Sequence, residues 1–284
     1  MGQHMSGDPD AEDRLVRLDD GDIHVVEDGM PGAPALLLIH GLGASTAWWD
    51  PVVPRLASAC RVIRVDLLGH GTSASPPDGY NIPAQACRVG AALDRLGAGR
   101  VVVIGHSTGG TVATALAEQR PGKVRAVSLI GIGPSPDADL GKGPLSRLLL
   151  ARFPGRLLWA LRTEATIRKA MSSAFTLPVD IPDATIEATR GMTHRALAGT
   201  ARGSLDYLRQ RSLPDRLAAL GLPLLVIFGT DDKRWRSSSA AAYRAVPDAR
   251  IELLPGVGHT PMMEDPQTTG TLLLDFAADA GNPR

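Results

Sequence analysis

Three side chains that could form a proton relay lie far apart in this sequence: Ser107, Asp232 and His259. A serine hydroxyl is a poor nucleophile at its free pKa and needs a base within hydrogen-bond reach. Histidine suits that role because its pKa lies near the working pH. A carboxylate behind the ring fixes its tautomer and stabilises the imidazolium that forms. These residue types predict nucleophilic attack on a carbonyl carbon.

The surroundings of Ser107 give the strongest local signal. Residues 101–104 are β-branched and aliphatic, which indicates a buried strand, and the apolar pattern from Thr111 onward favours a helix. Ser107 lies at the corner between them, with Gly105 and Gly109 two positions away on either side. Glycines let the flanking chain approach closely, so the hydroxyl projects away from its own backbone. This Gly-x-Ser-x-Gly pattern is weak alone and gains weight from the strand, the helix and the downstream partners.

Alternating strands and helices must position these side chains. We expect strands at 22–27, 35–39, 61–66, 101–104, 124–130, 223–228 and 250–254, and helices at 84–96, from 111, at 237–246 and at 266–278. This alternation predicts an α/β protein with a mostly parallel, doubly wound sheet covered on both faces. Ser107, Asp232 and His259 each follow an expected strand. Loops after parallel strands meet at one edge of a sheet, so the three should meet there.

The pattern changes between residues 134 and 211. This stretch has no strand candidate and five amphipathic helical segments, at 145–152, 156–162, 165–175, 183–197 and 200–209. We therefore expect a helical cap at 134–211 on a core formed by 14–133 and 212–284. The cap carries twelve lysines and arginines against seven acids, although the whole chain has a formal net charge of zero. Such an excess is mostly a solvated face, but it leaves room for an acidic or carrier-bound substrate.

Composition sets further limits. Hydrophobic residues make up 44% and charged residues 21% of the 284 residues, which is typical of a globular protein, and the zero net charge predicts no nucleic-acid partner. No apolar stretch approaches the length needed to cross a bilayer, so we expect no membrane partner. Residues 1–13 are expected to be disordered, with 1–4 a vector remnant and no signal peptide. Cys60 and Cys87 are expected to be buried free thiols in a cytoplasmic enzyme.

The motifs together resemble the α/β-hydrolase fold of the cap-bearing, serine-nucleophile type, from about residue 15 to 278. The resemblance implies a mostly parallel doubly wound sheet with the helical cap inserted after the sixth strand in the family's numbering, which corresponds to 124–130 here. It also implies the chain order of nucleophile, acid and base. The matching pieces are His40-Gly41-Leu42, Asp66-x-x-Gly69-x-Gly71-x-Ser73, Gly105-His106-Ser107-Thr108-Gly109-Gly110, Gly229-x-x-Asp232 and Gly258-His259.

The resemblance assigns the catalytic roles residue by residue. Ser107 is the expected nucleophile and His259 the base, while the backbone amides of Leu42 and Thr108 form the oxyanion hole. The family's Gly-x-x-Asp spacing selects Asp232 as the acid, with Asp231 as a turn or capping residue. The run after the acid, Lys233-Arg234-Trp235-Arg236-Ser237, departs from the family pattern of a short run ending in an apolar residue and proline. Its tryptophan could pack on the cap and its arginines could be solvated.

Five residues are candidates for binding the substrate, with ordinary core packing as the alternative: Trp48, Trp49, His106, Trp159 and Trp235. No metal or cofactor is expected, because the triad supplies its own base and charge stabilisation. The expected reaction is hydrolysis of an ester, thioester or lactone through an acyl-enzyme. The alternatives are elimination, cyclisation or acyl transfer in a biosynthetic pathway, and a ligand receptor on the same fold.

Overall fold

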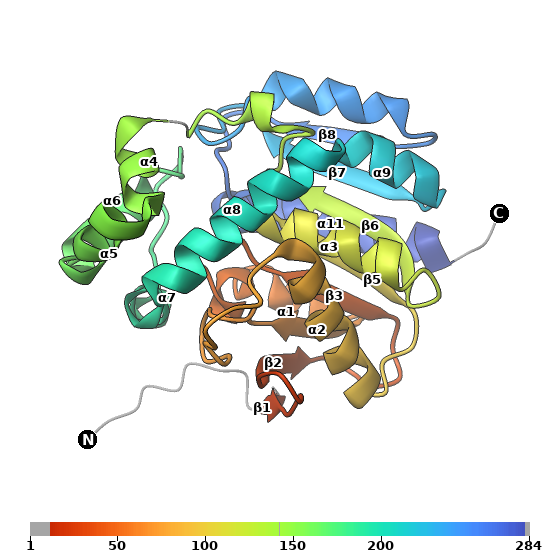
Figure 1. Ribbon diagram of the computed structural model, residues 1–284. Coiled ribbons are helices and arrows are strands. Elements are labelled where there is room, and N and C mark those ends of the chain that lie inside the picture. Colours follow the sequence, from red (N-terminus) through yellow and green to blue (C-terminus); the bar gives the residue numbers. More distant parts are fainter. Residues whose placement is uncertain (1–11, 142, 282–284) are drawn as a thin grey trace.

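The centre of the molecule is an eight-stranded sheet (Figure 1). The structure is a computed structural model that describes residues 12–141 and 143–281. The strands follow the order β1-β2-β4-β3-β5-β6-β7-β8; β3 to β8 are parallel, and β1 and β2 are antiparallel to their neighbours. Their bounds are β1 Glu12–Val16, β2 Ile23–Asp28, β3 Ala35–Ile39, β4 Arg61–Val65, β5 Val101–His106, β6 Val124–Ile130, β7 Leu224–Gly229 and β8 Arg250–Leu254. The mostly parallel, doubly wound sheet is therefore confirmed.

Helices cover both faces of the sheet (Figure 1). The central strands are continuous apolar runs whose side chains are buried on both sides, which divides the core into two clusters. One cluster lies beneath α2 (Ile82–Arg95), α3 (Thr108–Gln119) and α9 (Leu213–Leu220). The other lies beneath α1 (Val53–Ala57), α10 (Pro261–Glu264) and α11 (Pro266–Gly281). The segment expected as a helix at 237–246 is a 3-10 helix, η3 (Ser237–Ala245).

The core begins earlier than expected. β1 starts at Glu12 and pairs with β2, so residues 12 and 13 belong to the sheet and not to the disordered segment expected at 1–13. Arg14 adds an ion pair to Glu12 on the same strand and another to Glu27 on β2. The rest of that expected segment, residues 1–11, lies outside the described residues. Both cysteines are free as expected, but Cys87 is exposed and only Cys60 is buried.

Residues 134–211, here called the insert, lie between β6 and β7, and their described elements are all helices. The five α-helices are α4 (Pro144–Leu150), α5 (Arg152–Ala160), α6 (Glu164–Ser172), α7 (Asp183–Gly191) and α8 (His194–Gln210). In Figure 1, α4 to α7 stand to one side of the sheet, and α8 runs back across the core. There α8 packs against α2 and α3, so it anchors the insert.

The expectation of one helix at 183–197 is wrong, because the helix is interrupted at Met192 and Thr193. Both residues have extended backbones, and the Thr193 side chain accepts a hydrogen bond from the amide of Ala196. This cap starts α8, which continues through the separate helix expected at 200–209. In the described part of the chain, no helix is long and apolar enough to cross a bilayer.

Candidate active site

Ser107 lies in a backbone conformation that few residues other than glycine adopt. Its φ of 51° and ψ of −123° place it at a sharp corner between β5 and α3. Such a conformation costs on the order of 1–3 kcal/mol and persists only where the surroundings impose it. Here the Ser107 amide donates to the carbonyl of Ile130 at 2.8 Å, and its carbonyl accepts from the amide of Gly110 at 2.8 Å.

Two glycines make this corner possible. A Cβ at Gly105 would overlap with the backbone of Gly109, and a Cβ at Gly109 would overlap with the carbonyl of Ile39. The strand, the corner and the helix therefore pack more closely than any side chain would allow. The Gly-x-Ser-x-Gly pattern is a steric requirement of the observed backbone.

His259 and Asp232 are joined as the sequence predicts. His259 Nδ1 lies 2.9 Å from Asp232 Oδ2, and both side chains are buried. Asp232 Oδ1 accepts from the amides of Arg234 at 2.7 Å and Trp235 at 3.0 Å. Asp231 is exposed, and its carboxylate instead accepts from the hydroxyl of Thr230. The structure thus brings Asp232, and not Asp231, to the imidazole, and the ring's Nε2 is left as the acceptor.

Ser107 and His259 line the same cavity, of about 680 Å³. The Ser107 hydroxyl has no hydrogen-bond partner among the residues that the structure describes. Of the expected relay, the described structure therefore shows the hydrogen bond between Asp232 and His259 and none from the Ser107 hydroxyl. Leu42 and Thr108, the expected sources of the oxyanion amides, line this cavity as well.

His106 contacts both the backbone and the ring of His259, the candidate base. Its Nε2 donates to the carbonyl of His259 at 3.0 Å, and the two ring centroids lie 4.8 Å apart. Burial holds the pKa of His106 well below its usual range, and the neighbouring His259 lowers that pKa further. His106 is therefore a neutral donor that fixes the backbone of the base. It also lines the cavity, as expected of a substrate-binding candidate.

Glu264 of α10 fixes the loop that carries His259, and the sequence analysis missed it. Its carboxylate accepts from the amides of Gly258 at 2.9 Å and Thr260 at 3.1 Å, on either side of the base. The same carboxylate accepts from the amides of Thr176 and Leu177 in the insert. One half-buried carboxylate thus joins the loop that carries His259 to the insert. In the sequence, the only local indication of this role is that Glu264 lies four residues after Thr260.

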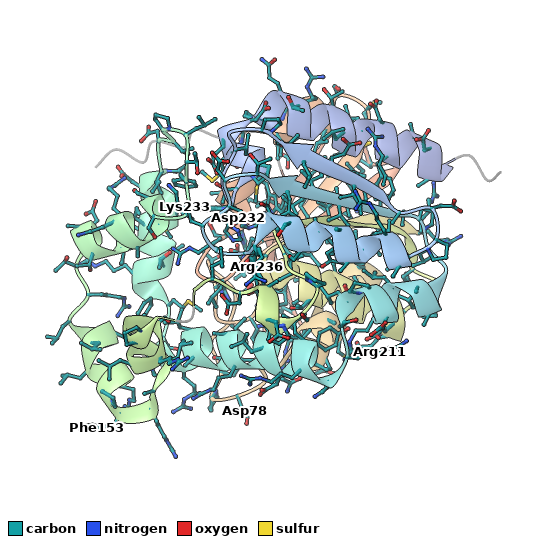
Figure 2. All side chains as sticks on the ribbon, turned by 90° about the horizontal axis from the view of Figure 1, so that it is seen from above. Asp78, Phe153, Arg211, Asp232, Lys233 and Arg236 are labelled. Atoms are coloured by element: carbon teal, nitrogen blue, oxygen red, sulfur yellow. The ribbon has the colours of Figure 1, made fainter. Side chains whose placement is uncertain are left out.

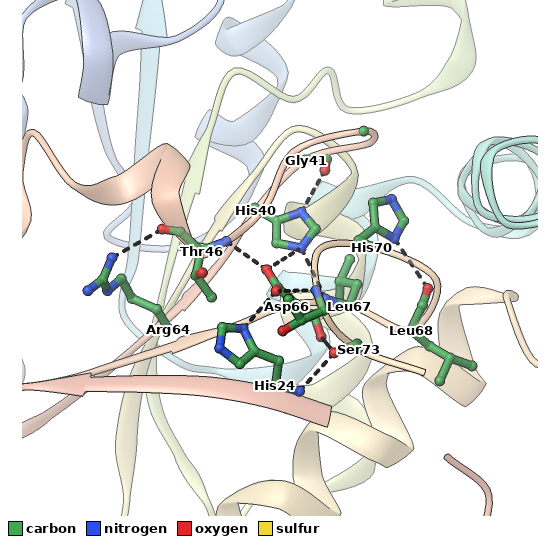
Figure 3. Close-up of polar contacts among 12 residues, drawn as sticks. His24, His40, Gly41, Thr46, Arg64, Asp66, Leu67, Leu68, His70 and Ser73 are labelled. Atoms are coloured by element: carbon green, nitrogen blue, oxygen red, sulfur yellow. Dashed lines mark hydrogen bonds and ion pairs between the residues drawn. The ribbon is translucent and has the colours of Figure 1, made fainter. Parts of the chain in front are cut away.

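The oxyanion loop after β3 is held by a network of buried polar groups (Figure 3). His40 Nδ1 donates to the carbonyl of Gly41 at 2.7 Å, while its Nε2 accepts from the amide of Leu67 at 3.0 Å. From the insert, the Thr189 hydroxyl donates to the carbonyl of Gly43 at 2.6 Å. These contacts fix the segment on either side of Leu42.

Asp66 is the centre of that network (Figure 3). Its carboxylate accepts from the amide of Thr46 at 2.7 Å, the amide of Thr72 at 3.0 Å and Nδ1 of His24 at 2.7 Å. Burial alone would raise the pKa of Asp66, but the hydrogen bond from His24 and the nearby imidazoles lower it overall. Burial alone would lower the pKa of His24, yet Asp66 and Asp13 together raise it. This pair binds the loops after β3 and β4 and has no part in the cavity.

Four of the five substrate-binding candidates line the cavity: Trp48, His106, Trp159 and Trp235. Trp49 does not, and this expectation is wrong. The 3-10 helix η1 (Thr46–Trp49) buries Trp49 completely in the core, whereas Trp48 stacks on Phe175 of the insert at 5.9 Å between ring centroids. The insert completes the cavity with apolar side chains: Leu149, Leu158, Leu161, Ile167, Met171 and Leu197.

The run after Asp232 contacts the insert, and two of its three basic side chains, Lys233 and Arg234, are not merely solvated. Lys233 Nζ donates to the carbonyl of Phe175 at 2.8 Å. Arg234 Nη2 donates to the carbonyl of Ala170 at 2.9 Å and the hydroxyl of Ser173 at 2.7 Å. Trp235 is buried. Figure 2 shows Asp232 and Lys233 on the side of the core that faces the insert. Among the described residues, no cluster of three or more His, Cys, Asp or Glu side chains could hold a metal ion.

Comparison with known proteins agrees with this geometry. Residues 36–269 match the alpha/beta hydrolase family. The chain is 30% identical over 250 residues to an uncharacterized protein of Mycobacterium tuberculosis, covering 82% of this chain and 72% of that protein. It is 26% identical over 253 residues to a pimeloyl-acyl-carrier-protein methyl ester esterase of Edwardsiella ictaluri, covering 87% and 94%.

A solved structure described as a membrane phospholipase A is also similar. It is 26% identical to this chain with a TM-score of 0.78, covering 96% of this chain and 88% of that one. The sequence match spans most of the sheet and the whole insert, and the structural match covers nearly the complete chain. The protein therefore belongs to the alpha/beta hydrolase family and is an enzyme of that family.

Proposed function

We propose that the protein hydrolyses carboxylic esters, including thioesters or lactones, through a covalent acyl-enzyme on Ser107. The observation that carries this proposal is the buried Asp232–His259 hydrogen bond beside a cavity that Ser107 also lines. A receptor has no use for a carboxylate-oriented imidazole next to a strained serine. Those features serve a base that removes a proton from a nucleophile.

In the first half of the reaction, His259 Nε2 takes the hydroxyl proton of Ser107 as Oγ attacks the ester carbonyl. Asp232 stabilises the imidazolium that forms without itself taking the proton. The amides of Leu42 and Thr108 donate to the oxyanion, and such donors contribute about 3 kcal/mol each to the transition state. The imidazolium then protonates the leaving alcohol or thiol, and the acyl group stays on Oγ.

In the second half, water attacks the acyl-enzyme while His259 again acts as the base. The tetrahedral intermediate uses the same amides, and its collapse releases the carboxylic acid and restores Ser107. The apolar lining of the cavity suits an acyl chain, while Arg162 and Arg234 add positive charge at its wall. Two similar proteins are named as an esterase and a phospholipase A, which supports an ester as the substrate.

The test compares hydrolysis of p-nitrophenyl esters of increasing chain length by the wild type and Ser107→Ala. We expect the variant to lose activity by about 10⁵-fold or more, because the nucleophile is gone. Ser238→Ala is the matched control, since Ser238 is exposed and outside the cavity. Equal turnover by wild type and Ser107→Ala would refute serine catalysis. Incorporation of ¹⁸O from labelled water into the acid separates hydrolysis from elimination, cyclisation and acyl transfer.

A further inference from the structure

Helix α5 of the insert exposes a row of large apolar side chains. Phe153, Leu157 and Leu161 follow each other at intervals of four residues and are 82%, 58% and 69% exposed. This spacing puts Phe153 and Leu157 on one face of α5 and continues to Leu161, the C-cap residue just after the helix. Figure 2 shows Phe153 at the outer edge of the insert, away from the sheet. A soluble surface rarely carries such a row without a partner.

Arginines lie directly beside this row. A second cavity, of about 850 Å³, is lined by Arg152 and Arg156 of α5 and by Arg195 and Arg202 of α8. Within the described residues, none of the four pairs with a carboxylate, and no acid lines the cavity. Arg195 donates only to the carbonyl of Pro77, and Arg202 only to that of Leu150. Four unneutralised guanidiniums around one cavity repel each other unless an anion binds there.

The two features form one surface because they alternate along the same helix. Arg152 precedes Phe153 and Arg156 precedes Leu157, so a basic row and an apolar row run side by side along α5. The inner face of the helix is occupied by Trp159, whose Nε1 donates to the carbonyl of Met192. A basic face beside an apolar face is the arrangement of helices that lie in a lipid headgroup layer.

We propose that this surface binds an anionic phospholipid membrane. The guanidiniums of Arg152, Arg156, Arg195 and Arg202 pair with lipid phosphates, and the apolar row enters the boundary between headgroups and acyl chains. A second copy of the chain fits poorly, because a two-fold interface would set these arginines against themselves. The sequence-based expectation of no membrane partner rested on the lack of a spanning segment, which peripheral docking does not need.

The docking surface adjoins the candidate active site. Leu161, the last member of the exposed row, also lines the cavity of Ser107, as do Leu158 and Trp159 of the same helix. A docked α5 would therefore hold one wall of that cavity against the lipid. Docking itself does not depend on the proposed reaction.

The test is sedimentation of the full chain with large unilamellar vesicles. One set contains phosphatidylcholine alone, and the other contains equal parts of phosphatidylcholine and phosphatidylglycerol. We expect binding to the anionic vesicles, much weaker binding to the neutral ones, and release as salt is raised, because salt screens the attraction.

Two variants separate the contributions to docking. Arg152→Glu with Arg156→Glu should weaken partitioning by at least about 25-fold, since each basic residue near an anionic surface contributes about fivefold. Phe153→Ser with Leu157→Ser should weaken it on neutral and anionic vesicles alike, because the inserted apolar area is lost. Arg244→Glu on η3 and Leu253→Ser on β8 change exposed residues elsewhere and should bind like the wild type.

Several outcomes would overturn the proposal. These are no sedimentation with anionic vesicles, equal sedimentation with neutral ones, or binding unchanged in both variants at unchanged melting temperature. Dimerisation without vesicle binding, abolished by Phe153→Ser with Leu157→Ser, would assign the surface to a second copy instead. Ser107→Ala should bind vesicles like the wild type. If the wild type hydrolyses esters but does not bind anionic vesicles, this inference is overturned and the proposed function stands.

Discussion

The edge of the sheet that carries Ser107, Asp232 and His259, here called the rim, differs from the insert in how its side chains are held. At the rim, each candidate catalytic group is held by several buried contacts: Ser107 by two backbone hydrogen bonds and close glycine packing, and Asp232 by three donors. The insert instead exposes Phe153, Leu157 and four arginines that pair with no carboxylate among the described residues. Under the proposed function, the rim fixes the chemistry and the insert determines which substrates reach it.

Besides the packing of α8 on the core, side-chain hydrogen bonds join the two regions at three loops of the candidate site. Thr189 holds the oxyanion loop through the carbonyl of Gly43. Arg234, beside the acid, donates to the insert at Ala170 and Ser173. Glu264 joins the base loop to the insert at Thr176 and Leu177. Changes at these junctions should therefore show how far the rim depends on the insert.

The largest effect is expected within the rim, from Asp232→Asn. The amide cannot stabilise the imidazolium and favours the wrong tautomer of His259, so kcat should fall by about 10⁴-fold. Asp231→Asn is the matched control and should change kcat less than about threefold, because Asp231 contacts Thr230 and not the imidazole. Steady-state ester hydrolysis measures both. The reverse ranking of the two variants would show that the wrong acid has been assigned.

A smaller effect is expected at the junction of the base loop, from Glu264→Gln. The amide nitrogen cannot accept, so amides of the base loop or the insert lose their partner and His259 shifts. Since a shift of about 1 Å can cost 10²-fold, kcat should fall by about 10- to 100-fold. Glu252→Gln, which removes only a partly exposed pair with Arg250, serves as control. Unchanged kcat in Glu264→Gln would mean that the rim holds His259 without it.

Lowering the pH should destabilise the fold through the buried histidines near the rim. Each of these histidines should raise the equilibrium constant for unfolding by up to about tenfold per pH unit. Burial, with the neighbouring His40, lowers the pKa of His70 to about 3, and burial also lowers that of His106. Below pH 6.5 these two histidines bind protons in the unfolded chain but stay neutral in the folded chain. Stability should therefore be complete above pH 6.5 and decline from there towards pH 3.

Urea unfolding between pH 7.5 and 4.5 measures this decline, and His70→Gln should reduce its slope. His24 acts in the opposite direction, because its raised pKa gives stability at low pH that is lost as pH rises through that value. The pair of His24 and Asp66 thus offsets only part of the decline in the free energy of unfolding at low pH. A free energy of unfolding that stays constant down to pH 4.5 would contradict the assignment of neutral, buried histidines.

The smallest effect is expected from Arg234→Ala. Loss of its hydrogen bonds to Ala170 and Ser173 frees one edge of the insert and removes a charge from the cavity wall. KM should rise by about threefold to tenfold while kcat stays within about twofold, because the relay is untouched. Arg236→Ala on the same loop is the control, since that side chain is exposed (Figure 2). A fall in kcat equal to that of Asp232→Asn would show that rim and insert are not separable.

Sequence patterns predicted the rim well because its constraints are local. The strands are continuous apolar runs, and the corner at Ser107 needs Gly105 and Gly109 for steric reasons visible in five residues. The resemblance to the family, through its Gly-x-x-Asp spacing, selected Asp232, and the hydrogen bond to His259 agrees with that choice. Even the helical character of the insert follows from periodicity, although the boundary between its last two α-helices was misplaced.

Contacts between distant segments could not be predicted in this way. The roles of Arg234 and Glu264 depend on carbonyls and amides about 60 to 90 positions away, which no local pattern specifies. Trp48 and Trp49 are neighbours of the same type, and only the turn of η1 decides which one faces the cavity. The break before Thr193 was missed because its threonine cap competes with a continuous apolar pattern.

The central claim, that Ser107 is activated by His259 and Asp232, is tested most directly with a fluorophosphonate probe. Intact mass and peptide mapping should show one adduct on Ser107 in the wild type and none in Ser107→Ala, with slower labelling in Asp232→Asn. An adduct on another residue, or a wild type that turns over esters without being labelled, would contradict the claim.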